Sequence, residues 1–244
     1  MGRLTDAIKH LLIINVLFFV ATQLYGDQMY LWFSLWFPES SNFRWWQIVS
    51  HMFMHGGFMH ILFNMYALWA FGSPLESAWG RNKFLFFYFS AGLGAALLHT
   101  AVNYYYFNEG LEALVNSGVS RSQVLETLKN GQYSPGWNDI VGRDTVDGML
   151  SAFNTPAVGA SGAVYGVLVA FAFMYPNAEL MLIFLPVPIK AKYFVPLIIL
   201  GDLFFGISGA NTGIAHFAHI GGALIGFIIM WYWKKNQFNK NRWN

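Results

Sequence analysis

Long apolar stretches recur along the chain, each close to the length that a helix needs to cross a bilayer. A spanning helix requires ~20 mostly apolar residues. The expected spans are residues 8–25, 57–78, 83–107, 158–175, 193–207 and 212–233. Backbone polar groups must all be hydrogen-bonded inside hydrocarbon, and an open sheet leaves some of them free. The pattern therefore predicts an all-α membrane protein, built as a six-helix transmembrane bundle.

Basic residues between these spans predict how the bundle is oriented. With the N-terminus inside, the cytoplasmic segments carry ten Lys and Arg residues, and the longer outside segments carry four. The positive-inside rule therefore predicts that both termini are cytoplasmic, as an even number of spans requires. The basic start followed by an apolar run could be a secretory signal. No small-residue cleavage site follows it, so we expect the first span to be retained.

Composition agrees with a membrane location. Hydrophobic residues make up 56% of the chain and charged residues only 11%, whereas an ordinary soluble domain is about 25% charged. The chain has no cysteine, which excludes disulfides and thiolate metal sites.

Two of the expected outside segments differ in character. Residues 27–56 are rich in aromatic side chains, so we expect this loop to rest in the membrane interface. Residues 108–156 form a polar insertion, in which residues 111–131 are typical of one or two short surface helices. No internal repeat and no separate soluble domain is apparent, so we expect residues 1–244 to form a single membrane domain.

A lone hydroxyl in the fourth span is the first candidate for chemistry. Ser161 lies within GASGAVYG, among very small residues and in the opening turn of that span. The N–H groups of a first turn have no helical partner and lie at the positive end of the helix dipole. Ser161 could therefore be a nucleophile placed beside donors for an oxyanion. The alternative is a capping or close-packing serine.

A histidine in the sixth span could activate that serine. Gly222 and Gly226 follow His219 on one helix face, and Gly162 and Gly166 form the same pattern on the fourth span. Faces of this kind allow two helices to approach closely. The crossing would bring the imidazole within hydrogen-bond reach of the Ser161 hydroxyl, as an unactivated serine requires. The alternative is a buried histidine bonded to a carbonyl group.

Further polar and aromatic residues share faces with these candidates. His60 and Asn64 are four residues apart, so both lie on one face of the second span. They could donate hydrogen bonds to an oxyanion, or form a polar clamp between helices. Tyr165 lies one turn after Ser161, where it could pack beneath the imidazole or serve as an ordinary core aromatic.

These motifs resemble those of a known family, the rhomboid intramembrane serine proteases. The segments that carry the resemblance are HILFNMYALWAFG, GASGAVYG and AHIGGALIG, on the second, fourth and sixth spans. GSPLESAWG, residues 72–80, is similar to the family's GxxxExxxG element, and LPVPIKAKYF, residues 185–194, resembles a cytoplasmic loop of bacterial members. The resemblance implies the rhomboid fold and a protease that needs no cofactor and no metal.

The resemblance also implies a role for each candidate residue. Ser161 would be the nucleophile and His219 the general base, in a dyad without an obligatory carboxylate. Asp202 would therefore lie outside the catalytic set, as a buried structural or gating group. The other expected roles are oxyanion donors at His60, Asn64 and the Ser161 N–H, an aromatic support at Tyr165, close-packing glycines at Gly162, Gly222 and Gly226, supporting histidines at His51 and His55, and a structural lock at Glu76.

The implied partners are transmembrane or membrane-anchored protein substrates and the lipid bilayer, with no nucleic acid. The expected location is the cell membrane, specifically the bacterial inner membrane, with the site open to the extracytoplasmic side. Two other classes of protein stay open. The histidine pairs 51/55 and 216/219 have spacings that can bind metal, although HExxH is absent. A transporter or an inactive binding relative would explain the glycine-rich helices and Asp202.

Overall fold

The fold is helical, with one small hairpin. The computed structural model describes residues 4–182, 185–208 and 212–240. The elements are α1 (Asp6–Tyr25), α2 (Asp27–Phe33), α3 (Gln47–Ser50), the 3-10 turn η1 (His51–Phe53), α4 (Phe58–Trp79), α5 (Arg81–Asn116), α6 (Arg121–Lys129), α7 (Trp137–Val141), α8 (Arg143–Asn154), α9 (Ser161–Met174), β1 (Glu179–Leu182), β2 (Leu185–Lys190), α10 (Ala191–Ser208) and α11 (His216–Lys240).

Each of the six expected spans contains a helix. By length and hydropathy, α1, α5, α10 and α11 can each cross a membrane, while α9 is a shorter apolar helix of 14 residues. The prediction of an all-α membrane protein is confirmed in its class. The largest boundary difference is in α5, which was expected to end near residue 107 and continues to Asn116.

A two-stranded hairpin departs from the all-α prediction. β1 and β2 pair antiparallel, with Glu179 opposite Lys190 and Leu180 opposite Ile189. The hairpin therefore includes most of the segment that was expected to be a cytoplasmic loop, residues 185–194. Helix α9 ends at Met174, just before Pro176, because the residue before a proline is disfavoured in helical geometry. The hairpin then leads the chain from the end of α9 into α10.

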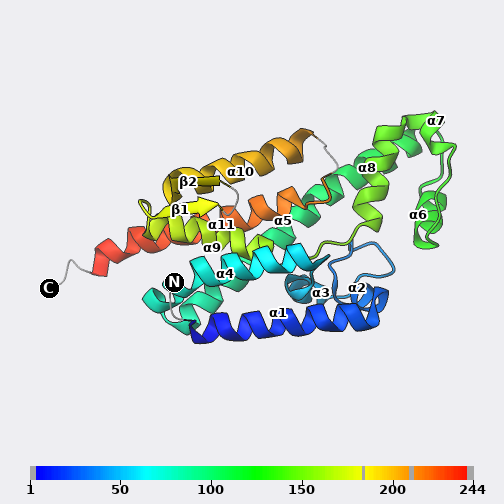
Figure 1. Cartoon of the computed structure of the whole chain (residues 1–244). Coiled ribbons are helices and arrows are strands. Elements are labelled where there is room, and N and C mark those ends of the chain that lie inside the picture. The colour runs from blue at the N-terminus through cyan, green and yellow to red at the C-terminus, as the bar shows by residue number, and fades with distance from the viewer. Residues whose placement is uncertain (1–3, 183–184, 209–211, 241–244) are drawn as a thin grey trace.

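The long helices lie side by side around α9, which packs against α4, α5, α10 and α11. Helix α1 lies along α4 at one side of the bundle, and α10 lies along α11 at the other side (Figure 1). Helix α1 begins and α11 ends at the same end of the bundle, whereas α6, α7 and α8 lie at the opposite end (Figure 1).

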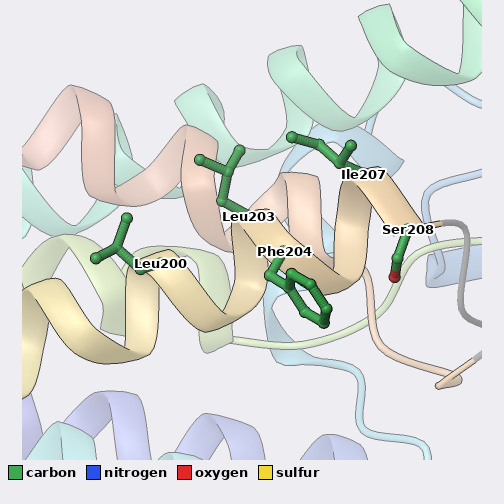
Figure 2. A pocket seen from close by; sticks show the side chains of 5 residues that line it. All are labelled: Leu200, Leu203, Phe204, Ile207 and Ser208. Carbon is green, nitrogen blue, oxygen red and sulfur yellow. The ribbon is translucent and has the colours of Figure 1, made fainter.

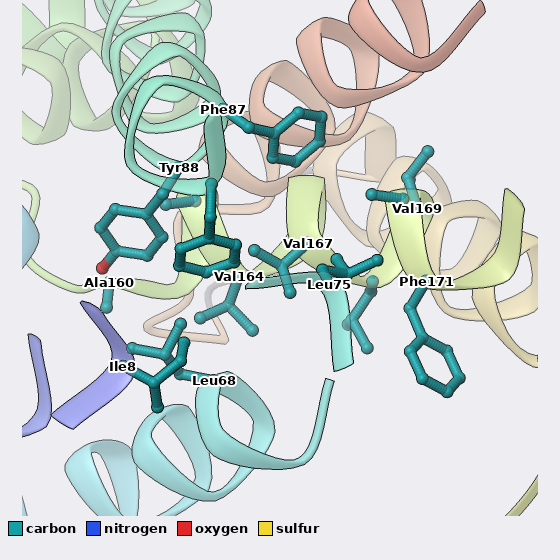
Figure 3. Close-up of a cluster of buried hydrophobic side chains, with 14 of the residues drawn as sticks. Ile8, Leu68, Leu75, Phe87, Tyr88, Ala160, Val164, Val167, Val169 and Phe171 are labelled. Carbon is teal, nitrogen blue, oxygen red and sulfur yellow. The ribbon is translucent and has the colours of Figure 1, made fainter. Parts of the chain in front are cut away.

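The core of the bundle is assembled around α9, where nine of the fourteen residues are buried. Val164 and Val167 of α9 meet Leu68 of α4 and Phe87 of α5 in one apolar cluster, together with Ile8 of α1 (Figure 3). Most of these side chains are completely buried. This packing holds α9 in a defined position, and Ser161 is the first residue of that helix.

The insertion at residues 108–156 has an apolar core of its own, although it was expected to be a polar surface segment. The extension of α5 supplies Phe107, Leu111 and Leu114, and Phe37 reaches the same cluster from the loop after α2. Helices α6, α7 and α8 complete the cluster with Val124, Leu128, Trp137, Val146, Met149, Ala152 and Phe153. Of residues 111–131, where one or two short surface helices were expected, the first part belongs to α5 and the later part forms the short helix α6, whose Val124 and Leu128 are buried.

A buried carboxylate joins α1 to the end of α4. Glu76 accepts hydrogen bonds from the backbone N–H of Ala7 at 2.7 Å and of Ile8 at 3.0 Å, and a third from the Thr5 hydroxyl. These donors lie in the first turn of α1, where N–H groups have no helical partner. Glu76 therefore caps α1 from another helix, which is a locking contact of the kind that its motif suggested. We call this region the anchor end of the bundle.

Candidate active site

The chain makes a sharp turn immediately before Ser161. Gly159 has φ +129°, a conformation that L side chains rarely adopt, and a Cβ there would lie 2.9 Å from Nε2 of His60. The Gly159 N–H donates to the carbonyl of His51 at 2.9 Å. Helix α9 then begins at Ser161 itself, so the N–H groups of its first turn are not used within the helix.

Glycines bring α9 and α11 into backbone contact, as their spacing predicted. A Cβ added at Gly222 would overlap the carbonyl oxygen of Gly162. One turn further along, a Cβ at Gly226 would lie 2.7 Å from Cα of Gly166. No side chain larger than hydrogen fits at these crossing points, so the small residues determine how closely the two helices approach.

This close approach places an imidazole against the serine hydroxyl. Nε2 of His219 is 2.9 Å from Oγ of Ser161. The ring of Tyr165 stacks on the His219 ring, with centroids 4.2 Å apart and an interplanar angle of 14°. The serine, the histidine and the supporting aromatic that the sequence suggested therefore come together at one point. We call this region the site end of the bundle.

Asp202 also contacts this histidine, although the family resemblance implied no catalytic role for it. Its Oδ1 lies 3.1 Å from Nδ1 of His219, on the side of the ring opposite Ser161. Asp202 is buried, as expected for a structural group, and it also contacts the expected base directly. The sequence does not indicate this contact, because α10 has no small-residue pattern like that of α9 and α11 to show which of its faces meets His219.

Two further groups extend the chain of hydrogen bonds beyond Asp202. Nδ1 of His216 is 2.5 Å from the same Oδ1 of Asp202, and Nε2 of His216 is 2.6 Å from Oγ1 of Thr212. The side chains of His216 and Asp202 are each only 7% exposed. Sequence reasoning considered His216 as a member of the histidine pair 216/219, whose spacing can bind metal, and proposed no role for it beside the serine. Its nitrogens face Asp202 and Thr212.

Of the two side chains expected as oxyanion donors, His60 lies near the serine and Asn64 contacts His60. His60 occupies the first turn of α4, and its Nε2 faces Gly159, two residues before Ser161. Its Nδ1 accepts a hydrogen bond from the Gly56 N–H at 3.3 Å, so Nε2 carries the proton and can donate. Asn64 is buried, and its amide nitrogen donates to the His60 carbonyl at 2.8 Å, which leaves its second N–H for another acceptor.

His51 and His55 lie just before α4 and are both buried. His51 is buried, and its Nδ1 donates to the carbonyl of Gln47 at 2.8 Å. Burial lowers the pKa of His51 from 6.5 to about 4. Burial, followed by the nearby His60, lowers the pKa of His55 to about 4. Both imidazoles are therefore neutral at pH 7. Among the described residues, there is no group of three or more His, Cys, Asp and Glu side chains arranged to hold a metal ion.

The outer surface of α10 is separate from this polar chain. An apolar hollow on that surface is lined by Leu200, Leu203, Phe204, Ile207 and Ser208, all from α10 (Figure 2). Asp202 lies on the other face of the same helix, towards α11. Helix α10 thus presents apolar side chains outward and a single carboxylate inward.

The chain matches the sequence model of the Rhomboid domain over residues 42–123 and 140–236. It is 29% identical to Rhomboid protease AarA of Providencia stuartii, over 76% of this chain and 54% of that protein. It is 25% identical to the mitochondrial Rhomboid protein 1 of Saccharomyces cerevisiae, over 77% of this chain and 42% of the relative. The chain therefore spans about half the length of these curated relatives. Because the domain match covers well over half of the chain, this protein belongs to the rhomboid family.

Proposed function

We propose that this protein is an intramembrane serine endopeptidase that cleaves transmembrane or membrane-anchored proteins through a Ser161–His219 dyad and an acyl-enzyme intermediate. The observation that carries the proposal is the 2.9 Å contact between Nε2 of His219 and Oγ of Ser161. A serine is a weak nucleophile until a neighbouring base can take its proton. Membership of the rhomboid family and similarity to a relative named as a protease support the same activity.

In the proposed reaction, His219 removes the proton from Ser161 as the hydroxyl oxygen attacks a peptide carbonyl carbon. His219 then gives that proton to the leaving amine, and the C–N bond breaks to leave an acyl-enzyme. A water molecule, deprotonated by His219, then attacks the ester carbon; the bond from that carbon to Oγ breaks, and His219 returns the proton to Oγ of Ser161. This sequence of roles is the one used by serine proteases of unrelated folds. Tyr165, stacked on the imidazole, would keep the ring plane fixed through both steps.

The negative charge that develops on the carbonyl oxygen needs donors that are already in place. The backbone N–H of Ser161 is free at the start of α9, and His60 presents Nε2 beside Gly159. Asn64, one turn along α4 from His60, supplies an amide N–H. Each such donor can contribute about 3 kcal/mol to the stability of the transition state.

A substrate helix has to unwind locally before its peptide bond can reach Ser161, because a helical carbonyl is already hydrogen-bonded within the helix. Helix-breaking and small residues near the cleaved bond should therefore favour cleavage.

The proposed topology is six spans with both termini in the cytoplasm and the site opening to the extracytoplasmic side. The excess of basic residues on the expected inside segments supports this orientation. So does the position of the start of α1 and the end of α11 at one end of the bundle (Figure 1). We propose a bacterial inner membrane as the location.

Two variants test the dyad directly. Ser161→Ala and His219→Ala should each reduce cleavage of a membrane-anchored reporter by roughly 10⁴-fold or more, while the protein stays folded. A fluorophosphonate probe should label the wild-type protein and fail to label Ser161→Ala. Ser151→Ala, at an exposed serine of the insertion, is the matched control and should be labelled like wild type. Full cleavage of the reporter by purified Ser161→Ala or His219→Ala would reject the proposal.

A further inference from the structure

We propose that Asp202 is a positioning residue for the reaction, which fixes the tautomer and the orientation of His219 from the side opposite Ser161. The inference rests on the proposed serine-protease function and adds a carboxylate to its two catalytic residues. It is carried by the hydrogen bonds that link Thr212, His216, Asp202, His219 and Ser161 in one continuous chain.

The donors and acceptors along this chain are consistent with only one useful arrangement. To accept the Ser161 proton, His219 must present a bare Nε2, so its single ring proton must be on Nδ1. Nδ1 faces Oδ1 of Asp202 at 3.1 Å. An ionised carboxylate only accepts hydrogen bonds, so it selects the tautomer that leaves Nε2 free. In this way Asp202 favours the form of His219 that can act as a base.

His216 and Thr212 hold the carboxylate in place. The same Oδ1 receives Nδ1–H of His216 at 2.5 Å, and an oxygen with two lone pairs can accept both histidines. Nε2 of His216 then accepts the hydroxyl proton of Thr212, at 2.6 Å. Every group in the chain has a partner while both imidazoles are neutral and the carboxylate carries the only charge. A carboxylate held by two N–H donors also forms stronger hydrogen bonds than a neutral acceptor.

The surface of α10 is shaped to bring Asp202 to this position. Gly206 follows Asp202 by one turn on the same face, where an added Cβ would lie 3.2 Å from the Phe217 ring and 3.4 Å from Cβ of His216. Gly201 lies beside Asp202 on another side of the helix, where an added Cβ would meet nothing within 4 Å. The glycine at position 206 is therefore the one that permits the close approach of α10 to the first turn of α11.

A purely structural role for Asp202 predicts a different outcome. In that case the His216–Asp202 bond would serve to attach α10 to α11, and the contact with His219 would be incidental. Removing the carboxylate would then lower stability without changing the turnover of the folded protein. A positioning role instead predicts a loss of turnover with little change in substrate binding, because the base loses its correct proton arrangement.

The first test is Asp202→Asn in the full-length protein, reconstituted in bilayers with a transmembrane reporter. We expect kcat to fall at least about 100-fold, since an amide can donate to Nδ1 and favour the wrong tautomer of the base, while KM stays within about twofold. Fluorophosphonate labelling of Ser161 should slow by a similar factor. A kcat within threefold of wild type in the folded variant would overturn the proposal.

Glu76→Gln is the matched control for this substitution. It also turns a buried, hydrogen-bonded carboxylate into an amide, but at the anchor end of the bundle. We expect a lower thermal stability with kcat within about twofold of wild type. If Glu76→Gln lowered kcat as much as Asp202→Asn does, the effect of Asp202 would have to be attributed to a general loosening of the bundle, and the positioning role would be rejected.

Two measurements do not depend on the folding of the Asp202 variant. Gly206→Leu should separate α10 from α11 and lower kcat at least about tenfold, whereas Gly201→Leu, on the same helix, should leave it unchanged. In wild-type protein carrying ¹⁵N-histidine, solid-state NMR should find His219 neutral, with the proton on Nδ1. Equal activity of the two glycine variants, or a proton on Nε2, would contradict the proposal.

The proposed function and this inference fail in different ways. If the wild-type protein neither reacted with the fluorophosphonate probe nor cleaved the reporter, both the protease assignment and the role of Asp202 would be rejected. An active wild type with an inactive Ser161→Ala and a fully active Asp202→Asn would leave the dyad in place and reject the role of Asp202 alone.

Discussion

The two ends of the bundle each hold a buried carboxylate, and the partners of those carboxylates differ. At the anchor end, Glu76 accepts from backbone N–H groups and a hydroxyl of the first turn of α1. At the site end, Asp202 accepts from two imidazoles, one of which contacts Ser161. Amide N–H groups do not change protonation near pH 7, whereas imidazoles do. The same chemical group can therefore cap a helix at one end and influence proton transfer at the other.

The two ends also differ in how their helices pack against one another. At the site end, glycines of α9 and α11 meet backbone to backbone, so the distance from Ser161 to His219 depends on positions that no side chain can occupy. At the anchor end, packing depends on larger apolar side chains such as Leu75 and Phe84, which are completely buried. A rigid crossing made of backbone atoms suits a site in which two reacting groups must keep one separation.

The largest expected effect comes from filling the helix crossing at the site end. Gly222→Val places a Cβ onto the carbonyl oxygen of Gly162, and a backbone atom cannot move aside without moving its helix. We expect a loss of about 3 kcal/mol in the free energy of unfolding and no detectable labelling of Ser161. Thermal unfolding and fluorophosphonate labelling measure the two effects. Gly201→Val, at a position with open space, is the control. If Gly222→Val were labelled like the wild type, the glycine crossing would not determine the position of Ser161 against His219.

A smaller effect, on stability alone, is expected at the anchor end. Glu76→Gln replaces a charged acceptor by a neutral one opposite the first turn of α1, and it should cost about 2 kcal/mol. Reversible unfolding in detergent can measure this loss. The exposed Glu126 of the insertion offers the control Glu126→Gln, which should be neutral. If Glu76→Gln had the same free energy of unfolding as the wild type, the cap would contribute nothing to stability.

The smallest expected effect is a pH dependence of the free energy of unfolding, which we assign to His51 and not to the anchor end. The pKa of His51 is about 4 in the fold and 6.5 when unfolded, so the unfolded chain binds more protons between these values. Stability should therefore be constant above pH 6.5 and fall as pH drops towards 4, by about 1 kcal/mol at pH 5.5 for this residue.

His51→Gln should reduce that slope, because glutamine can still donate to the Gln47 carbonyl but does not titrate. Unfolding at pH 7.5 and at pH 5.5 measures the change. His10→Gln, at an exposed histidine of α1 near the anchor end, should leave the slope as it is in wild type. An identical slope in His51→Gln would contradict the assignment of the pH effect to this buried imidazole.

Local pattern was enough to predict most of the bundle. Apolar stretches of spanning length indicated where the long helices lie, and glycines at three- and four-residue spacing indicated which faces of α9 and α11 meet. Both signals are local, because a membrane helix must satisfy its own backbone and must match the bilayer in length. The extension of α5 and the apolar core of the insertion were missed. Their hydrophobic residues, such as Leu111 and Val124, are dispersed among charged ones and become a cluster only when α5 to α8 pack together.

By itself, the sequence determined that this is a helical membrane protein with a serine at the start of one span and a histidine beside glycines on another. Only the tertiary structure decided which intramembrane carboxylate faces that histidine. Asp202 lies on α10 and His219 on α11, and the rotation of one helix against the other depends on contacts summed over both surfaces. The spacing of residues along the chain does not reveal that rotation, so the sequence does not indicate that Asp202 faces His219.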